Sequence, residues 1–249
     1  MLVVDRQLFR FSKLSPAYRF VASTPLPVAM RQWIPIRGGQ VVINADIRTR
    51  ALAGWPIHIL NADGTVAQSF GATQPELDPT NRYKTWRTLA IGRTGDIWAA
   101  RVNEYVIERW TTDGRLLTVV RRNAAWFKPW TNYEGPESVV RPPDYLRAIW
   151  EDSAGLLWVA ISVPDAQWKR TNFKAREGDM IPMPRADNDS YYDTIVEVLD
   201  VSSGELIATQ RFPHSMHTVG NGQPFVTYHE EASGNPLYRV WHFNLNQGR

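Results

Sequence analysis

The chain contains no cysteine among its 249 residues. That absence excludes a disulfide scaffold, a thiolate zinc site and a cysteine nucleophile. The sequence also lacks any apolar run approaching the roughly 18 residues of a membrane-spanning helix, so we expect no transmembrane segment. Residues 1–6 show no basic segment followed by an apolar stretch, so no signal peptide is visible. A periplasmic or extracellular location would require a longer N-terminus, and the sequence assigns no compartment.

Strong charge of one sign is absent as well. Lys and Arg number 28 against 25 Asp and Glu, which gives a formal net charge of +3. Proteins that bind nucleic acid usually gather their basic residues in one run or on one face, and no such run occurs here. We therefore expect no nucleic-acid partner. Apolar residues make up 43% of the chain, which is enough for a packed core.

What the chain does contain is a repeat. Segments 86–100 and 146–160 align without gaps, and looser copies occupy 31–43 and 217–227. Each copy is a β-rich run, a turn and a second β-rich run, with glycine at the turn. A second hairpin follows the repeat, with Asp-Gly at its turn in the clearest copies, a strong hairpin signal because these residues tolerate positive φ. The repeating unit is thus four antiparallel strands, and no long amphipathic helix is visible.

Four-stranded units repeated at this spacing predict an all-β fold, a β-propeller built of four-stranded antiparallel blades. We expect about four to five blades in one domain spanning residues 1–249. The expected parts are a partial blade at 1–28, blades at about 29–72, 83–122 and 143–213, and an incomplete blade at 214–249. An open arc of blades would expose unpaired strand edges. We therefore expect the chain to be the C-terminal part of a larger ring, of about six blades.

The repeated units resemble the bacterial six-bladed β-propellers of the NHL-repeat and TolB-like kind. The resemblance rests on the elements at 86–100 and 146–160, where a strand and a glycine turn precede Ile-Trp or Leu-Trp. The Asp-Gly hairpins at 57–70 and 106–120 support it. The resemblance implies the fold and little about activity, since propellers host binding, scaffolding and catalysis alike.

The connections between strands differ in length according to their position in the blade. Turns from first to second strand and from third to fourth strand are short. The other connections are long, at 44–55, 72–85, 123–144 and 164–193. In a propeller these long connections all emerge on one face, called here the long-loop face. Connections of this length are uncommon without a function or disorder, so we expect the ligand on this face.

Aromatic and cationic residues in the long connections are the first candidate contacts. Trp126 and Trp130 lie in one connection, and Trp168 and Arg170 in another. Rings beside cations suit a protein, peptide or glycan ligand. The alternative is that the rings pack the connections down onto the blades.

Three arginines form a second candidate site. Arg31, Arg87 and Arg147 occupy the same position at the start of the first strand, and His214 is the nearest equivalent in the last unit. First strands line the central channel of a propeller, so three guanidiniums there would form an anion site. The alternative is that each arginine pairs with an acid of a neighbouring blade. Candidate acids are Glu76, Asp78, Glu137 and Asp144.

The histidines raise the question of a metal. His214, His217 and the pair His229-Glu230 could reach the same face, and two imidazoles with a carboxylate would suit zinc or iron. The spacing is a weak signal, so we expect no metal and no cofactor. The leading hypothesis is a non-catalytic binding or scaffold propeller; the alternative is a propeller-type hydrolase or lactonase with a divalent metal near the channel. The sequence predicts no oligomeric state.

Overall fold

The computed structural model describes residues 2–5, 10–25, 30–45, 52, 54–71, 82–132, 140–169, 191–218, 225–230 and 235–245. Within these ranges the regular structure is almost entirely β, and two short 3-10 turns, Arg37–Gly39 and Arg82–Thr85, are the exceptions. None of the helical turns in these ranges has the length or apolar character that crossing a bilayer requires.

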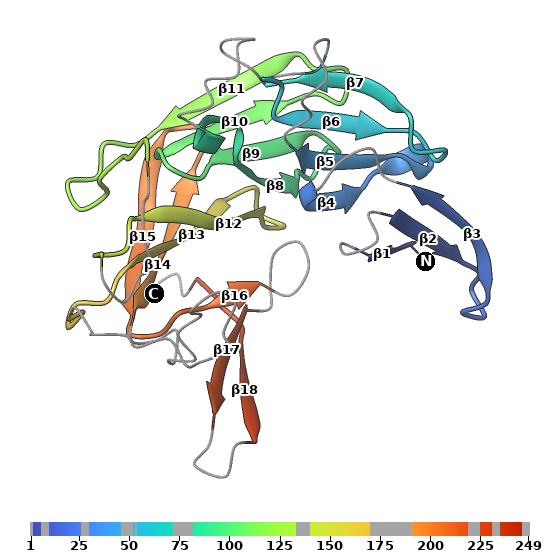
Figure 1. The fold of residues 1–249 in the computed structure, drawn as a ribbon. Coiled ribbons are helices and arrows are strands. Elements are labelled where there is room, and N and C mark those ends of the chain that lie inside the picture. Colours follow the sequence, from blue (N-terminus) through green and yellow to red (C-terminus); the bar gives the residue numbers. More distant parts are fainter. Residues whose placement is uncertain are drawn as a thin grey trace.

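The described strands form five antiparallel sheets, three with four strands and two with three. Figure 1 shows these sheets arranged around a common centre, with β4, β8, β12 and β16 innermost. The first sheet contains β1 (Leu2–Asp5), β2 (Arg10–Leu14) and β3 (Phe20–Pro25). The second contains β4 (Met30–Pro35), β5 (Val41–Ala45), β6 (Ile57–Leu60) and β7 (Val66–Phe70). The third contains β8 (Arg87–Ile91), β9 (Ile97–Arg101), β10 (Val106–Trp110) and β11 (Leu116–Arg121).

The fourth sheet contains β12 (Tyr145–Glu151), β13 (Leu157–Pro164), β14 (Tyr192–Asp200) and β15 (Glu205–Phe212). The last contains β16 (His217–Thr218), β17 (Phe225–Glu230) and β18 (Pro236–Trp241). In every sheet, strands that follow each other in the chain lie side by side and antiparallel. The predicted all-β propeller arrangement of four-stranded antiparallel sheets is thereby confirmed.

Glycines at positive φ close the first hairpin of the two best-aligned repeats. Gly95 has φ +89° between β8 and β9, and Gly155 has φ +87° between β12 and β13. The same backbone bond closes each turn, because Gly92 N donates to Asp96 O and Asp152 N donates to Leu156 O. The local turn chemistry read from the sequence therefore fixes these hairpins.

The core lies between neighbouring sheets rather than within one sheet. Trp98 of β9 is fully buried and packs with Ile149 and Leu157 of the next sheet. Trp158 of β13 packs in the same way with Phe225 of β17. Each sheet thus buries its faces against its neighbours, which is how radial repetition stabilises a propeller.

Hydrogen bonds also join the innermost strands of neighbouring sheets. The Gln32 side chain on β4 donates to Leu89 O at 2.8 Å and accepts from Leu89 N at 2.7 Å on β8. Thr88 Oγ1 on β8 donates to Leu146 O on β12 at 3.2 Å. These bonds hold three innermost strands at fixed offsets and so fix the wall of the central space.

Strand register determines where the connections leave each sheet. In the second sheet Met30 pairs with Ala45 and Ile57 pairs with Phe70. The start of β4, the end of β5, the start of β6 and the end of β7 therefore lie at the same end of the sheet. The third and fourth sheets repeat this pattern. The described ends of the long connections consequently lie at one face.

Candidate functional site

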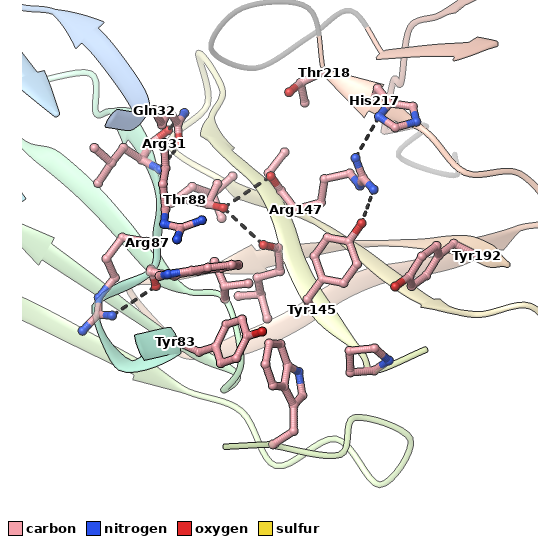
Figure 2. Close-up of a pocket in the computed structure, with 18 of the residues that line it drawn as sticks. Arg31, Gln32, Tyr83, Arg87, Thr88, Tyr145, Arg147, Tyr192, His217 and Thr218 are labelled. Carbon is pink, nitrogen blue, oxygen red and sulfur yellow. Dashed lines mark hydrogen bonds between the residues drawn. The ribbon is translucent and has the colours of Figure 1, made fainter. Parts of the chain in front are cut away.

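A pocket of about 900 Å³ lies at the centre of the long-loop face. Its wall comes from the innermost strands of four sheets, β4, β8, β12 and β16 (Figure 2). The described parts of the connections add Tyr83, Trp130 and Pro143, and the start of β14 adds Tyr192. This size is at the upper end of the range for small-molecule pockets, and convergence of several elements on one cavity is typical of ligand sites.

Three rings form one side of the pocket, called here the aromatic wall: Tyr83, Trp86 and Trp130. The Tyr83 ring stands edge-on to Trp86 at 4.5 Å between centroids and edge-on to Trp130 at 4.7 Å. Trp130 Nε1 donates to Asp144 O at 2.6 Å, and Trp130 O accepts from Asn103 Nδ2 at 2.7 Å. The rings are therefore held in place before any ligand arrives.

Arg31 extends the aromatic wall with a cation. Its side chain is exposed, and its Cζ atom lies 3.2 Å from the centroid of the Trp86 ring. A guanidinium over an indole face is a favourable cation–π arrangement. Arg31 thus presents both positive charge and a planar surface at the pocket, beside Gln32 (Figure 2).

Arg147 lies on the opposite side, on β12, and is half-buried. Its Nε donates to Ser162 Oγ at 2.8 Å, and its Nη1 contacts His217 Nδ1 of β16 at 2.8 Å. Its Nη2 donates to the hydroxyl of Tyr145 (Figure 2). Three side chains from three strands therefore fix this guanidinium at the pocket wall.

Arg87 occupies the repeat position of Arg31 and Arg147, but its guanidinium contacts groups of its own sheet and of the turn before it. It is 5% exposed, donates to Lys84 O at 2.6 Å, and points away from Arg147 (Figure 2). Its Nε lies 3.7 Å from Glu108 Oε2 of β10. Burial lowers the pKa of Arg87 to about 10, so it stays protonated at neutral pH beside Glu108. Of the three predicted guanidiniums, the structure thus brings two to the pocket, and Arg87 pairs with an acid of its own sheet.

The histidine at the pocket is His217, not His214. His217 lies on β16, where it pairs with Val226, and borders the pocket. His214 is not among the described lining residues; its ring lies 5.7 Å from that of Trp241, and its carbonyl accepts from Thr194 Oγ1 at 2.8 Å. The last copy of the repeat, 217–227, begins at His217, so the repeat itself indicated which histidine would lie at the pocket.

Of the three tryptophans predicted to contact the ligand, one lies at the pocket and one packs against the core. Trp130 borders the pocket, whereas Trp126 packs 6.0 Å from the Phe127 ring against the core between sheets. Trp168 is half-buried, with its backbone N donating to Asp165 O at 3.1 Å, and is not among the described lining residues. Arg170 and the candidate acids Glu76, Asp78 and Glu137 lie outside the described residues.

Sequence reasoning did not select Tyr83, Trp86 or Tyr145, which contribute rings to the pocket. Trp86 directly precedes Arg87, and Tyr145 stands two positions before Arg147. The signal was therefore an aromatic residue one or two positions before Arg87 and Arg147; Arg31 has none there. Asp144, the last candidate acid, accepts from Lys128 N at 2.8 Å instead of pairing with a register arginine.

The described lining does not fit a divalent cation. It contains Arg31, Arg87 and Arg147 and no Asp or Glu. Nowhere in the described ranges do three or more His, Asp or Glu residues come together in a group able to hold a metal ion. The side chains of His229 and Glu230 are outside this description. Divalent metals in proteins usually take several carboxylate or imidazole ligands, and the described lining offers one imidazole, His217, beside positively charged arginines.

Comparison with known proteins supports the fold. No protein-family model matches the chain, and no curated protein matches it. A solved structure of a DUF4221 family member from Bacteroides vulgatus is similar, with 10% identity and a TM-score of 0.59 over 96% of this chain and 73% of that one.

Virginiamycin B lyase from Staphylococcus aureus is 16% identical, with a TM-score of 0.46 over 98% of this chain and 81% of that one. The Pan2 WD40 domain of Neurospora crassa is 8% identical, with a TM-score of 0.41 over 92% of this chain and 58% of that one. At these identities such likeness concerns architecture alone, and the DUF4221 structure agrees with the propeller fold.

Proposed function

We propose that the chain is a binding propeller that recognises a protein, peptide or glycan at its long-loop face. A group of the ligand would enter the central pocket. The observation that carries this proposal is the convergence of the aromatic wall, Arg31 and Arg147 on one cavity of about 900 Å³. Cavities lined by rings, with a few fixed polar groups, are the usual form of a ligand site.

Each part of the pocket has a distinct contribution. The half-buried rings of Trp86 and Trp130, which pack on the buried Tyr83, offer flat apolar surface with little conformational entropy to lose. Arg31 and Arg147 add positive charge on opposite sides of the cavity. A ligand with both an apolar surface and negative charge therefore matches the pocket best.

Larger ligands would extend beyond the pocket over the same face. Trp126, Trp168, Arg170 and His214 stay predicted contacts for such a ligand, outside the pocket. A six-bladed ring of the NHL-repeat or TolB-like kind also stays a prediction. A hydrolase or lactonase with a divalent metal is less well supported, because the described lining offers a cation no carboxylate.

Screening on glycan and peptide arrays, followed by calorimetric titration of the hits, tests the proposal. Arg31→Ala should weaken binding by about three- to thirtyfold, because it removes a cation–π-supported charge from the pocket. Arg31 is exposed, so we expect the melting temperature to change little. Arg37→Ala is the matched control, since Arg37 is an exposed arginine at the opposite end of the same sheet.

Two results would count against the proposal. One is the absence of any array ligand. The other is a ligand whose affinity is the same for the wild type, Arg31→Ala and Arg37→Ala. Conversion of many molecules of an array ligand per molecule of protein would instead favour the enzymatic alternative.

A further inference from the structure

Arginines that are buried or half-buried in the described chain nearly all contact a carboxylate. Removing a guanidinium from water is costly unless an anion compensates it, so such pairing is expected. The pairs are Arg87 with Glu108 at 3.7 Å, Arg101 with Glu108 at 2.8 Å, Arg122 with Glu197 at 2.6 Å, and Arg109 with Asp96.

Arg147 is the exception among these described arginines. Its partners are the Ser162 hydroxyl, the Tyr145 hydroxyl and the His217 ring, and none of them is an anion. Arginine has only donors, so His217 Nδ1 must accept from it, and the His217 ring is neutral in this arrangement. The guanidinium therefore carries a positive charge that no described side chain neutralises.

The repeat explains why Arg147 lacks the acid that Arg87 has. Glu108 pairs with Ala99, the residue after Trp98, and Glu197 pairs with Val159, the residue after Trp158. Glu197 is thus the counterpart of Glu108 in the sheet that contains Arg147.

Two residues that flank strands of the third sheet already bind the Glu197 carboxylate. Tyr105 donates to Glu197 Oε2 at 2.6 Å, and Arg122 donates to both carboxylate oxygens at 2.6 and 3.0 Å. Glu197 is fully buried beneath these contacts. The acid in the corresponding position is therefore already neutralised elsewhere, which leaves Arg147 without a counter-ion.

The geometry of the three contacts leaves donors for a ligand. A guanidinium carries five N–H groups, two on each terminal nitrogen. The contacts to Ser162, His217 and Tyr145 use one N–H on each of the three nitrogens. One N–H therefore remains on each terminal nitrogen, and a planar pair of donors matches the two oxygens of a carboxylate.

We propose that Arg147 binds a carboxylate group of the ligand, with the adjoining flat apolar part lying against the aromatic wall. This inference rests on the proposed function and narrows its ligand class to organic carboxylates carried on a flat ring. The neutral partners of Arg147 hold the guanidinium in position without cancelling its charge, so the ligand supplies the counter-ion.

Benzoate and benzamide are a matched pair of probes for this inference. They share a ring and differ in charge, so titration followed by tryptophan fluorescence measures what the carboxylate adds. We expect benzoate to bind the wild type at least about tenfold more tightly than benzamide, in line with a charge-assisted hydrogen bond. Arg147→Gln should abolish that preference by weakening benzoate binding much more than benzamide binding, and Arg147→Lys should retain part of it. Arg37→Gln is the control.

A second measurement covers the case in which Arg147→Gln fails to fold. In the 15N-labelled wild type, the Nε–H resonance of Arg147 should move on adding benzoate and stay in place on adding benzamide. Equal affinity for the two probes, or a benzoate preference that survives in folded Arg147→Gln, would overturn the inference. If array ligands still require Arg31 in that case, the binding function stands and only the carboxylate assignment fails.

Discussion

At the scale of single residues, the repeat predicted where the three arginines lie on their strands but not where their guanidiniums point. The repeat correctly placed Arg31, Arg87 and Arg147 at equivalent points of three innermost strands. Their guanidiniums nevertheless have different surroundings: a ring for Arg31, an acid for Arg87 and neutral groups for Arg147. Part of the cause lies on their own strands: Arg31 and Arg147 each sit at a register irregularity, whereas Arg87 pairs directly with Arg101. The rest lies on other strands, where Glu108 is within reach of Arg87 and its counterpart Glu197 is occupied by Arg122. A linear repeat carries no information on such contacts, which depend on the packed neighbours.

Asp144 provides a residue-scale test that depends on pH. Burial raises the pKa of this carboxyl, which accepts from Lys128 N at 2.8 Å. A raised pKa in the folded state means that the charged form opposes folding above that pKa. This cost disappears below the usual value of 3.8, where both states are protonated. Asp144→Asn keeps an acceptor without the charge, so we expect a higher melting temperature at neutral pH and a gain that shrinks as the pH falls from the raised pKa to 3.8.

Asp113→Asn is the control for this measurement, because we expect it to lower the melting temperature at neutral pH. The Thr111 hydroxyl donates to Asp113 and lowers the pKa of that carboxyl. Its charged form therefore favours folding at neutral pH, and that advantage is lost as the pH falls through the lowered pKa. Melting curves of both variants from acid to neutral pH would show whether the melting temperature rises for Asp144→Asn and falls for Asp113→Asn. A gain for Asp144→Asn that does not change with pH would contradict the assignment.

At the scale of strands and sheets, local signals predicted the hairpins well. The turns at Gly95 and Gly155 formed where expected, because turn chemistry acts over a few residues. Contacts between sheets were less predictable. Acids of the long connections were the expected partners of the register arginines across blades. The described ion pair between sheets is instead that of Arg122 with Glu197, two residues outside the long connections that the sequence analysis did not select.

Glu197 is the element-scale test, since it joins the third and fourth sheets. Its fully buried carboxylate accepts from Tyr105 and Arg122. Glu197→Gln removes the ion pair and leaves the Arg122 charge uncompensated, so we expect a loss of about 2–4 kcal/mol in unfolding free energy. Denaturant unfolding measures this loss.

Glu205→Gln, at the exposed start of β15, is the matched control. It should change the unfolding free energy by less than about 0.5 kcal/mol, as exposed substitutions usually do. A loss for Glu197→Gln no larger than that of the control would show that this bond does not stabilise the contact between sheets.

At the scale of the whole molecule, the pocket is a product of radial arrangement. Its wall takes a few residues from each of four sheets, so no single segment of sequence encodes it. The sequence predicted the face, because long connections repeat at the same strand ends. It could not predict which rings meet there. Tyr83 and Trp130 are far apart in sequence, and their 4.7 Å contact exists only once the sheets have packed.

The same arrangement implies that stability is uneven around the molecule. Strands β9 and β13 lie almost wholly buried between neighbouring sheets. Strand β3 is mostly exposed, with Phe20 at 66% and Val21 at 55% exposed. Strands with few buried contacts open locally at low free energy, whereas core strands exchange only on global unfolding.

Native-state hydrogen exchange at low denaturant tests this gradient. We expect the amides of β3 to exchange through local opening, with little dependence on denaturant, and those of β9 and β13 to follow global unfolding. Strand β11 is the internal control, since it is also a mostly exposed edge strand but belongs to a complete four-stranded sheet. Its protection should fall between the two. Protection of β3 equal to that of β9 would mean that the first sheet is as tightly coupled to its neighbours as the central ones, and that exposure does not determine local stability here.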